Sequence, residues 1–226
     1  MKITYIHHSA FLVETESACL LFDYFAGEIP PILEEKPLYV LSSHNHHDHF
    51  SQSIFSLKHP RITYLLSWDI PEVQMPNAHF LRPYEIWSDG ILSLETFRST
   101  DEGVAFWCRV DGREIYHAGD LNHWYWEGED EQWNADMTAA YRAEVAKMAG
   151  RTADVAFIPV DPRLEDWFYL GADDFMAKAD AKVLFPMHFW GDFSVCEKLI
   201  NHPCSEKYRS RIIAIQEKGQ DRKSVV

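Results

Sequence analysis

The first part of the chain alternates short apolar stretches with polar turns. Such stretches are typical of β-strands when turn residues bound them. Ser51 precedes a short helical pattern at 52–58 and is suited to be its N-cap. Strands are predicted at residues 2–6, 10–14, 19–23, 38–42, 62–66 and 79–81.

The second part mixes strands with helices. A helix is predicted at 136–148 because its apolar residues share one face, and Gly150 follows as a C-cap. Asp111-Gly112 is a hairpin signal between two strand patterns. Strands are predicted at 90–97, 104–110, 113–117, 155–160, 182–185 and 211–216, helices at 172–179 and 193–200, and a frayed polar tail at 217–226. Two batches of strands with helices between and after them predict one mixed α/β core.

Composition sets the scale of this core. The chain has 226 residues, of which 46% are hydrophobic, and it contains no linker-like stretch. We therefore expect a single domain spanning residues 1–226. No run of about 20 apolar residues occurs, so no membrane span is expected. The N-terminus enters a strand pattern directly and lacks a signal peptide, which favours the cytoplasm.

Charge and cysteine content narrow the partners. The formal net charge of −14 disfavours a nucleic-acid partner, which would need a basic surface. The four cysteines are far apart, so Cys19 and Cys108 are expected to be buried free thiols. The expected partner is a small-molecule substrate, with no membrane and with a homo-oligomer as an open possibility.

Metal-binding side chains are concentrated directly after one predicted strand. His44, His46, Asp48 and His49 all fall in this short segment. Imidazole and carboxylate groups suit zinc and similar first-row cations. Side chains two residues apart in extended backbone point to the same side, so His44 and His46 can bind one ion. Asp48 and His49 lie past the turn and can reach a second ion.

The His44-x-His46-x-Asp48-His49 segment resembles the signature of the metallo-β-lactamase superfamily. Two further motifs follow in the order of that family, YHAGD at 116–120 and PMHFW at 186–190. The opening IHHSAFL at 6–12 also looks like the branch that contains the ascorbate-6-phosphate lactonases. The resemblance implies a four-layer αββα sandwich with two mixed sheets inside.

The resemblance also implies two divalent metal ions, with zinc as the first choice and manganese or iron as alternatives. Each implied ligand follows a predicted strand, and loops at the same ends of adjacent strands converge. The implied ligands are His44 and His46 on the first ion, Asp48, His49 and His188 on the second, and Asp120 bridging both. Asp48 would in addition orient the attacking water and carry its proton, which makes it the expected catalytic residue.

One position of the family pattern is not matched. The family has a third histidine on the first ion, upstream of Asp120, but the turn at 97–104 contains no histidine. The hairpin would place this turn beside Asp120. We therefore expect Asp101 to replace the imidazole, directly or through water, because its short side chain loses little rotamer freedom. Glu102 is the second choice and an unfilled first site the third. An oxygen ligand would favour manganese or iron.

Two histidines that are not among the implied ligands are candidates for supporting them. His8 ends the first strand pattern and His117 lies just before Asp120. Residues around a metal site fix the tautomer and orientation of the ligand rings. Each of the two fits equally well as a half-buried structural histidine.

Trp124 and Arg163 are candidates for contacting a substrate. Trp124 belongs to an aromatic-rich segment at 121–133 that can line a pocket, cover an oligomer contact or pack on the sheet edge. The planar guanidinium of Arg163 can hold a carboxylate or phosphate. It can equally well pair with Asp161 or Glu165.

These groups together predict a metal-dependent hydrolase. Two metal ions sharing a water would lower its pKa and provide a hydroxide nucleophile. The expected substrate is a small molecule, namely a lactone, ester, amide or phosphoester. One alternative is a phosphodiesterase acting on nucleic acid or lipid head groups, and another is a non-catalytic metal-binding or sensor protein. The scaffold alone does not select a substrate.

Overall fold

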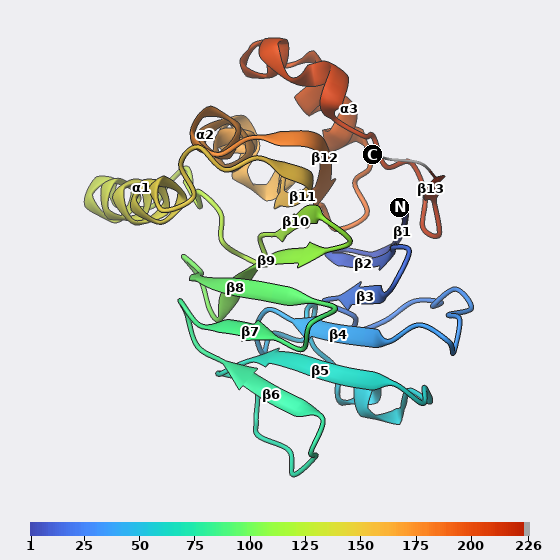
Figure 1. The fold of residues 1–226 in the computed structure, drawn as a ribbon. Helices are drawn as coiled ribbons and strands as arrows, with labels where there is room; N and C mark the ends of the chain where they lie inside the picture. The colour runs from blue at the N-terminus through green and yellow to red at the C-terminus, as the bar shows by residue number, and fades with distance from the viewer. Residues whose placement is uncertain (224–226) are drawn as a thin grey trace.

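Two β-sheets packed face to face form the centre of the molecule (Figure 1). The computed structural model describes residues 1–223. The first sheet has seven strands in the order β13-β1-β2-β3-β4-β5-β6, and the second has six in the order β12-β11-β10-β9-β8-β7. Each sheet contains both antiparallel and parallel neighbours. The two mixed sheets predicted from the family resemblance are confirmed.

The strands of the first sheet follow the apolar stretches of the N-terminal part. The hydrogen bonding is antiparallel from β1 to β3 and parallel from β3 to β6. The bounds are β1 Lys2–His7, β2 Ala10–Glu14, β3 Cys19–Phe22, β4 Leu38–Ser42, β5 Ile62–Ser67, β6 Ala78–Leu81 and β13 Asp221–Lys223. Because the four parallel strands β3 to β6 end at the same edge, their following loops meet there.

The second sheet is antiparallel from β7 to β10 and parallel from β10 to β12. Its short edge strand β7 was not predicted, since two of its three residues are exposed and no apolar alternation marks it. The bounds are β7 Ile86–Ser88, β8 Ser93–Arg98, β9 Val104–Val110, β10 Arg113–His117, β11 Ala153–Pro159 and β12 Ala181–Met187.

Alternation of side chains along β10 shows how the layers are joined. The ring of His117 stacks on Phe22 of the first sheet, with ring centroids 4.8 Å apart. The adjacent Tyr116 points to the opposite face and stacks on Phe175 of helix α2 at 4.7 Å. Successive strand residues point to opposite faces, so one strand contacts the partner sheet and the outer helices.

The α-helices lie beside the second sheet, while the outer face of the first sheet is covered by a short 3₁₀-helix and loops (Figure 1). The αββα sandwich is therefore confirmed, with one outer layer much thinner than the other. The bounds are α1 Glu131–Ala146, α2 Leu170–Lys178 and α3 Ser194–Asn201, with 3₁₀-helices η1 Gln52–Ser56, η2 Pro162–Trp167, η3 Pro203–Lys207 and η4 Arg209–Arg211. None of the helices formed by residues 1–223 has the length and apolar character needed to cross a membrane.

Helix α1 begins earlier than predicted. The Asp130 side chain accepts hydrogen bonds from the backbone N–H groups of Gln132 and Trp133, which caps the helix at this point. The apolar pattern alone pointed to a start at residue 136. The predicted C-cap at Gly150 was wrong, because the helix ends at Ala146 with Lys147 as its C-cap. The element predicted at 52–58 is a 3₁₀-helix, and Ser51 is its N-cap as expected.

The C-terminal part differs from the prediction in two places. The strand predicted at 211–216 is absent, since η4 ends at Arg211 and only a single bridge joins Ile212 to Leu184. The tail predicted to be frayed instead pairs with β1, with Ile3 opposite Arg222. The tail residues form strand β13 by hydrogen bonding to the backbone at the exposed edge of β1. This pairing does not require apolar side chains, so the pattern of apolar residues does not reveal β13. Residues 224–226 of the predicted tail lie outside the described residues.

The predicted hairpin at Asp111-Gly112 is confirmed. Both residues adopt positive φ, 52° and 69°, and Arg113 pairs with Val110. The same register continues to His117, which pairs with Phe106. The first residue of β9, Val104, therefore lies beside Gly119. The turn between β8 and β9 therefore lies at the sheet end where β10 also ends.

We predict that Gly103 in this turn is far less tolerant of a side chain than Gly112. Both have positive φ, +72° and +69°, so alanine would introduce strain of about 1–2 kcal/mol at either position. A Cβ atom at Gly103 would lie 2.0 Å from the Ser43 carbonyl oxygen, whereas one at Gly112 would meet none of the described residues within 4 Å. Gly103→Ala should therefore lower the free energy of unfolding by roughly 1–3 kcal/mol more than Gly112→Ala. Equal losses in denaturant unfolding would contradict this packing.

Candidate metal centre

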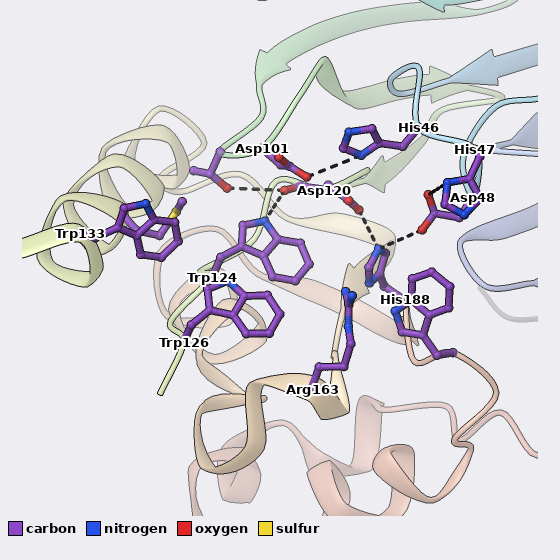
Figure 2. A pocket seen from close by; sticks show the side chains of 13 residues that line it. His46, His47, Asp48, Asp101, Asp120, Trp124, Trp126, Trp133, Arg163 and His188 are labelled. Atoms are coloured by element: carbon purple, nitrogen blue, oxygen red, sulfur yellow. Dashed lines mark hydrogen bonds and ion pairs between the residues drawn. The ribbon is translucent and has the colours of Figure 1, made fainter. Parts of the chain in front are cut away.

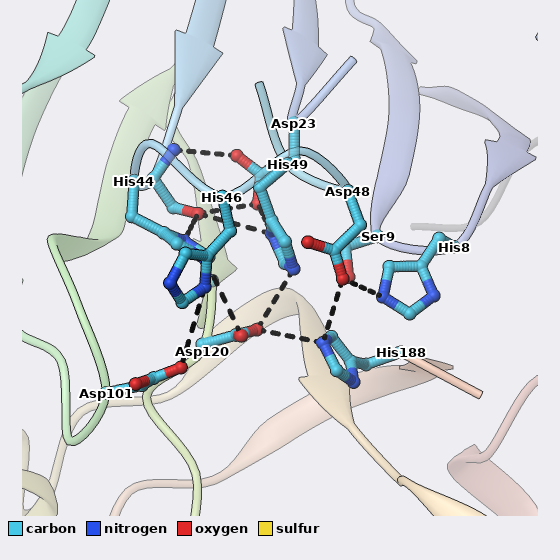
Figure 3. A network of polar contacts seen from close by, with 12 residues as sticks. His8, Ser9, Asp23, His44, His46, Asp48, His49, Asp101, Asp120 and His188 are labelled. Atoms are coloured by element: carbon cyan, nitrogen blue, oxygen red, sulfur yellow. Dashed lines mark hydrogen bonds and ion pairs between the residues drawn. The ribbon is translucent and has the colours of Figure 1, made fainter. Parts of the chain in front are cut away.

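The predicted ligands meet where several strands of both sheets end (Figure 3). The loop after β4 supplies His44, His46, Asp48 and His49. Asp120 follows β10, and the last two contributors come from the loop after β12 and the turn between β1 and β2, which supply His188 and His8. The common end of neighbouring strands thus brings together residues that are distant in sequence.

The side chains form two adjacent groups. Within each group, one potential ligand atom per residue lies within 4.8 Å of every other. The first group is His44, His46 and Asp120, and the second is His8, Asp48, His49 and His188. This division matches the implied ligand sets, except that His8 joins the second group. The sequence suggested only a supporting role for His8.

Asp120 lies between the two groups. Its Oδ2 is 3.6 Å from His44 Nε2, and its Oδ1 is 3.2 Å from His49 Nε2. The same Oδ1 lies 3.4 Å from His188 Nε2. Its two oxygens therefore face different groups, which is the arrangement that a bridging carboxylate requires. Bridging itself stays a prediction.

Hydrogen bonds hold the ligand rings in one orientation. His49 Nδ1 donates to the Asp23 carboxylate at 2.7 Å, and His188 Nδ1 donates to Asp161 at 2.9 Å. His44 Nδ1 lies 3.0 Å from the hydroxyl of Ser43. Each ring therefore presents Nε2 toward the centre, as metal-binding histidines with carboxylate or hydroxyl partners do.

Asp23 and Asp161 are functional residues that the sequence analysis did not identify. Both side chains are fully buried. Each follows a strand at the end of the sheet where the ligands lie, β3 and β11 respectively. That position was the one available signal, but a single Asp after a strand is also a common turn residue.

The residues present fit divalent cations. His44 Nε2, His49 Nε2 and Asp120 Oδ1 are buried and have no hydrogen-bond partner among residues 1–223. Leaving such atoms unpaired is costly, and a cation would satisfy them together. Burial lowers the pKa of His44 and of His49 to about 4, so both rings are neutral and offer a lone pair. Burial opposes ionisation of Asp120, but His188 and His49 outweigh it and hold its pKa well below its usual value.

Unusual backbone conformations gather around the site. Four non-glycine residues with positive φ lie here, namely His8, Asp23, His188 and Trp190. Such conformations are unfavourable and persist where surrounding contacts determine them. The backbone N–H of His188 donates to the His8 carbonyl, which ties the β1–β2 turn to the loop after β12.

His117 supports the centre without reaching the pocket. Its Nε2 donates to the Ser9 carbonyl at 2.9 Å, and its Nδ1 accepts the Gly119 N–H at 3.1 Å. Both ring nitrogens are thus engaged in fixing backbone. The side chain is fully buried and stacks on Phe22. These contacts fit the interpretation of His117 as a structural histidine, which is one of the two that the sequence left open.

Asp101 approaches the first group from the β8–β9 turn. Its Oδ2 lies 3.8 Å from His46 Nδ1, and Glu102 Oε2 lies 3.5 Å from His46 Nε2. Asp101 also lines the pocket above the centre. Neither carboxylate belongs to the tightly spaced first group, so ligation by Asp101 stays a prediction.

A pocket of about 530 Å³ opens over the two groups (Figure 2). Asp48, Asp120 and His188 contribute to its polar side. Its aromatic lining consists of Trp124, Trp126, Trp133 and Trp190, and the Trp190 ring lies beside His188 with ring centroids 5.9 Å apart. The aromatic-rich segment therefore lines a pocket, which was one of its three interpretations. Arg163 also lines the pocket, and it pairs with Asp161 at 2.5 Å as one of its interpretations expected.

The sequence profile of the beta-lactamase superfamily domain matches residues 2–188. The chain belongs to this superfamily. The match extends from the first strand to His188 and includes every residue of both groups. The superfamily part of the sequence-based resemblance is thereby confirmed, whereas none of the relatives described below points to the lactonase-like branch.

Among curated proteins, the superfamily relatives are named as metal-dependent hydrolases. A UPF0173 metal-dependent hydrolase of Symbiobacterium thermophilum is 27% identical over 214 residues, which is 86% of either chain. One of Desulforamulus reducens is 27% identical over 141 residues, and this match covers 53% of the present chain and 62% of that protein. The chain thus spans less than two thirds of that second relative.

Solved structures of other proteins share the fold. Igni18, a metallo hydrolase from Ignicoccus hospitalis, superposes with a TM-score of 0.65 at 16% identity, over 97% of this chain and 96% of that one. The metallo-beta-lactamase fold protein YhfI of Bacillus subtilis gives 0.63 at 13% identity, over 98% and 99%. At these identities the likeness concerns the fold alone.

We predict that His46→Ala or Asp120→Ala removes most of the transition metal bound by the purified protein. Each substitution deletes a side chain of the first group, and Asp120 also faces the second. His47→Ala is the matched control, because this side chain is in the same loop, is 90% exposed and belongs to neither group. Elemental analysis measures the outcome. An unchanged metal content in folded Asp120→Ala would refute the bridging role.

We further predict that Asp101→Ala selectively empties the first metal position. The second group does not include Asp101, so the ion held there should remain. Metal-to-protein stoichiometry and thermal unfolding of the purified variant provide the measurement. Glu102→Ala serves as the comparison, because Glu102 approaches the other nitrogen of His46. A loss in Glu102→Ala with none in Asp101→Ala would transfer the role to Glu102.

Proposed function

We propose that the protein is a metal-dependent hydrolase that uses water to cleave a bond in a small molecule. The observation that carries this proposal is the pair of His/Asp groups linked by Asp120 beneath a single pocket. The names of the superfamily relatives support the same reaction class. Divalent ions bound by the two groups would acidify a water molecule and polarise a carbonyl or phosphoryl oxygen.

Asp48 is the residue best placed to handle the proton of that water. It lines the pocket, and its Oδ2 lies 3.3 Å from His8 Nε2 and 3.9 Å from His188 Nε2. Burial opposes ionisation of Asp48, but the polar contact with His8 and the nearby His49 outweigh it and lower its pKa. The carboxylate is therefore anionic at neutral pH and can accept a proton at Oδ1 or Oδ2.

Zinc is our first choice for both positions, because most of the potential ligands are imidazoles. Manganese or iron is the alternative at the first position, where Asp101 or Glu102 would add oxygen ligands. Within the pocket, the aromatic wall suits a substrate with an apolar or ring-containing part.

The substrate class we propose is a lactone, ester, amide or phosphoester of small size. A pocket of about 530 Å³ is in the range of small-molecule sites. The net charge of −14 disfavours nucleic acid as the substrate. A lactone would agree with the resemblance of the opening segment to the lactonase branch.

A hydrolysis panel tests this function. Metal-loaded protein should hydrolyse at least one class among aryl lactones, p-nitrophenyl esters, anilides and bis-p-nitrophenyl phosphate. Asp48→Asn should lower kcat by roughly 100-fold or more, because a positioned base is lost. Asp89→Asn is the control, since this carboxylate bonds Tyr39 far from the pocket. Chelation should abolish the activity and added zinc or manganese should restore it.

Two results would count against the proposal. A metal-replete protein that turns over no member of the panel would favour a metal-binding or sensor role. An Asp48→Asn variant with full metal content and unchanged kcat would remove Asp48 from the mechanism.

A further inference from the structure

Arg163 brings the one strong cation to the pocket wall. Of the thirteen described residues that line the pocket, no other is lysine or arginine. Figure 2 shows its guanidinium directed toward His188 and the metal-binding side chains. The side chain is 48% exposed, so it is available from the pocket.

The guanidinium is held in one orientation. Asp161, which is fully buried, accepts hydrogen bonds from Arg163 Nε at 2.9 Å and from Nη2 at 2.5 Å. It also accepts the backbone N–H of Arg163 at 2.9 Å. The central guanidinium carbon lies 5.0 Å from the ring centre of Trp190 and 5.6 Å from that of Trp126. A planar group fixed at one edge and near two aromatic rings loses little freedom when it binds a ligand.

The contacts with Asp161 use only part of the hydrogen-bonding capacity of the Arg163 guanidinium. A guanidinium has five N–H groups, and the contacts with Asp161 use those at Nε and one at Nη2. Nη1 has no hydrogen-bond partner in the part of the chain that the structure describes. Its two N–H groups and the remaining one on Nη2 are the donors that a carboxylate or phosphate binds.

Trp190 is placed in a way that core packing does not account for. Its backbone has a φ of 51°, an unfavourable conformation for a side chain of this size. Yet its side chain is 48% exposed. Its ring lies next to Arg163 and next to His8, whose ring centroid is 4.4 Å away. The strained turn thus holds an exposed aromatic ring beside both the guanidinium and His8.

We propose that Arg163 binds an anionic group of the substrate, a carboxylate or a phosphate monoester, beside the metal centre. This inference rests on the proposed hydrolase function and specifies its substrate as an anion. Trp124 and Trp126 contact the apolar part of that substrate, and its scissile bond faces Asp48 and Asp120. Three carboxylates also line the pocket, and their negative charge would repel an anion. Bound metal ions would offset this charge, so we expect the anion to bind the metal-loaded protein.

Binding of three matched probes tests the proposal without turnover. Metal-loaded protein is titrated with benzylphosphonate, whose C–P bond is not hydrolysed, and with phenylacetate and 2-phenylethanol, followed by calorimetry and by tryptophan fluorescence. At least one anion should bind roughly tenfold or more tightly than the neutral alcohol, as charge-assisted hydrogen bonds allow. The tighter of the two anions identifies the group as phosphate or carboxylate.

The metal ions also attract anions, so variants are needed to distinguish anion binding by Arg163 from anion binding by the metal ions. Arg163→Gln should bind the anions and the alcohol about equally, with unchanged metal content, and Arg163→Lys should keep part of the preference. Arg142→Gln is the matched control, because Arg142 pairs with Asp174 at 3.0 Å and does not line the pocket. It should bind the probes as the wild type does.

Three results would overturn the proposal. The first is a wild-type protein that binds neither anion more tightly than the alcohol. The second is an Arg163→Gln variant that keeps the full preference for the anion over the alcohol, which would assign anion binding to the metal ions. Loss of metal in Arg163→Gln with equal weakening of all three probes would make Arg163 a positioning residue for Asp161 and His188. Absence of hydrolysis would overturn the proposed function, yet leave this binding result readable.

Discussion

The buried carboxylate of Asp23 is the interaction on which the shape of the metal-binding loop depends. It accepts the backbone N–H and the hydroxyl of Ser43, both at 2.7 Å, and the Nδ1 proton of His49 at 2.7 Å. Burial raises the pKa of Asp23, and the nearby His117 and His44 and the Ser43 donors act against this increase. One side chain at the end of β3 therefore holds both the start and the end of the loop after β4.

The local part of this architecture was predictable from sequence. The loop containing His44 to His49 and the hairpin at Asp111-Gly112 are both marked by neighbouring residues, and the register of that hairpin follows from its two-residue turn. Family resemblance supplied the distant partners Asp120 and His188. What sequence could not show is which isolated acidic residues fold back onto the ligands, because Asp23 and Asp161 meet their histidine partners only through tertiary packing.

The same reasoning explains the errors in secondary structure. The β13 strand forms because β1 has a free edge, and its three residues are all exposed, so no apolar pattern marks it. Helix α1 begins at a cap, Asp130, in a stretch where aromatic residues obscure helical periodicity. Those aromatic residues in turn form the pocket wall, and Trp124 Nε1 donates to the Asp120 carbonyl at 3.0 Å. Trp124, Trp126 and Asp120 thus lie in one loop between β10 and α1, so a change in this part of the pocket wall also affects Asp120.

The contact between the N-terminal turn and the loop after β12 bears on how the protein is made. The ring centroids of His8 and His188 lie 4.1 Å apart, although the two residues are 180 positions apart in sequence. During synthesis, the second group of metal-binding residues therefore stays incomplete until β12 and its following loop have left the ribosome. All residues of the first group have been synthesised once Asp120 is made. The two groups are therefore completed at different points of translation, the second only after most of the chain has been made.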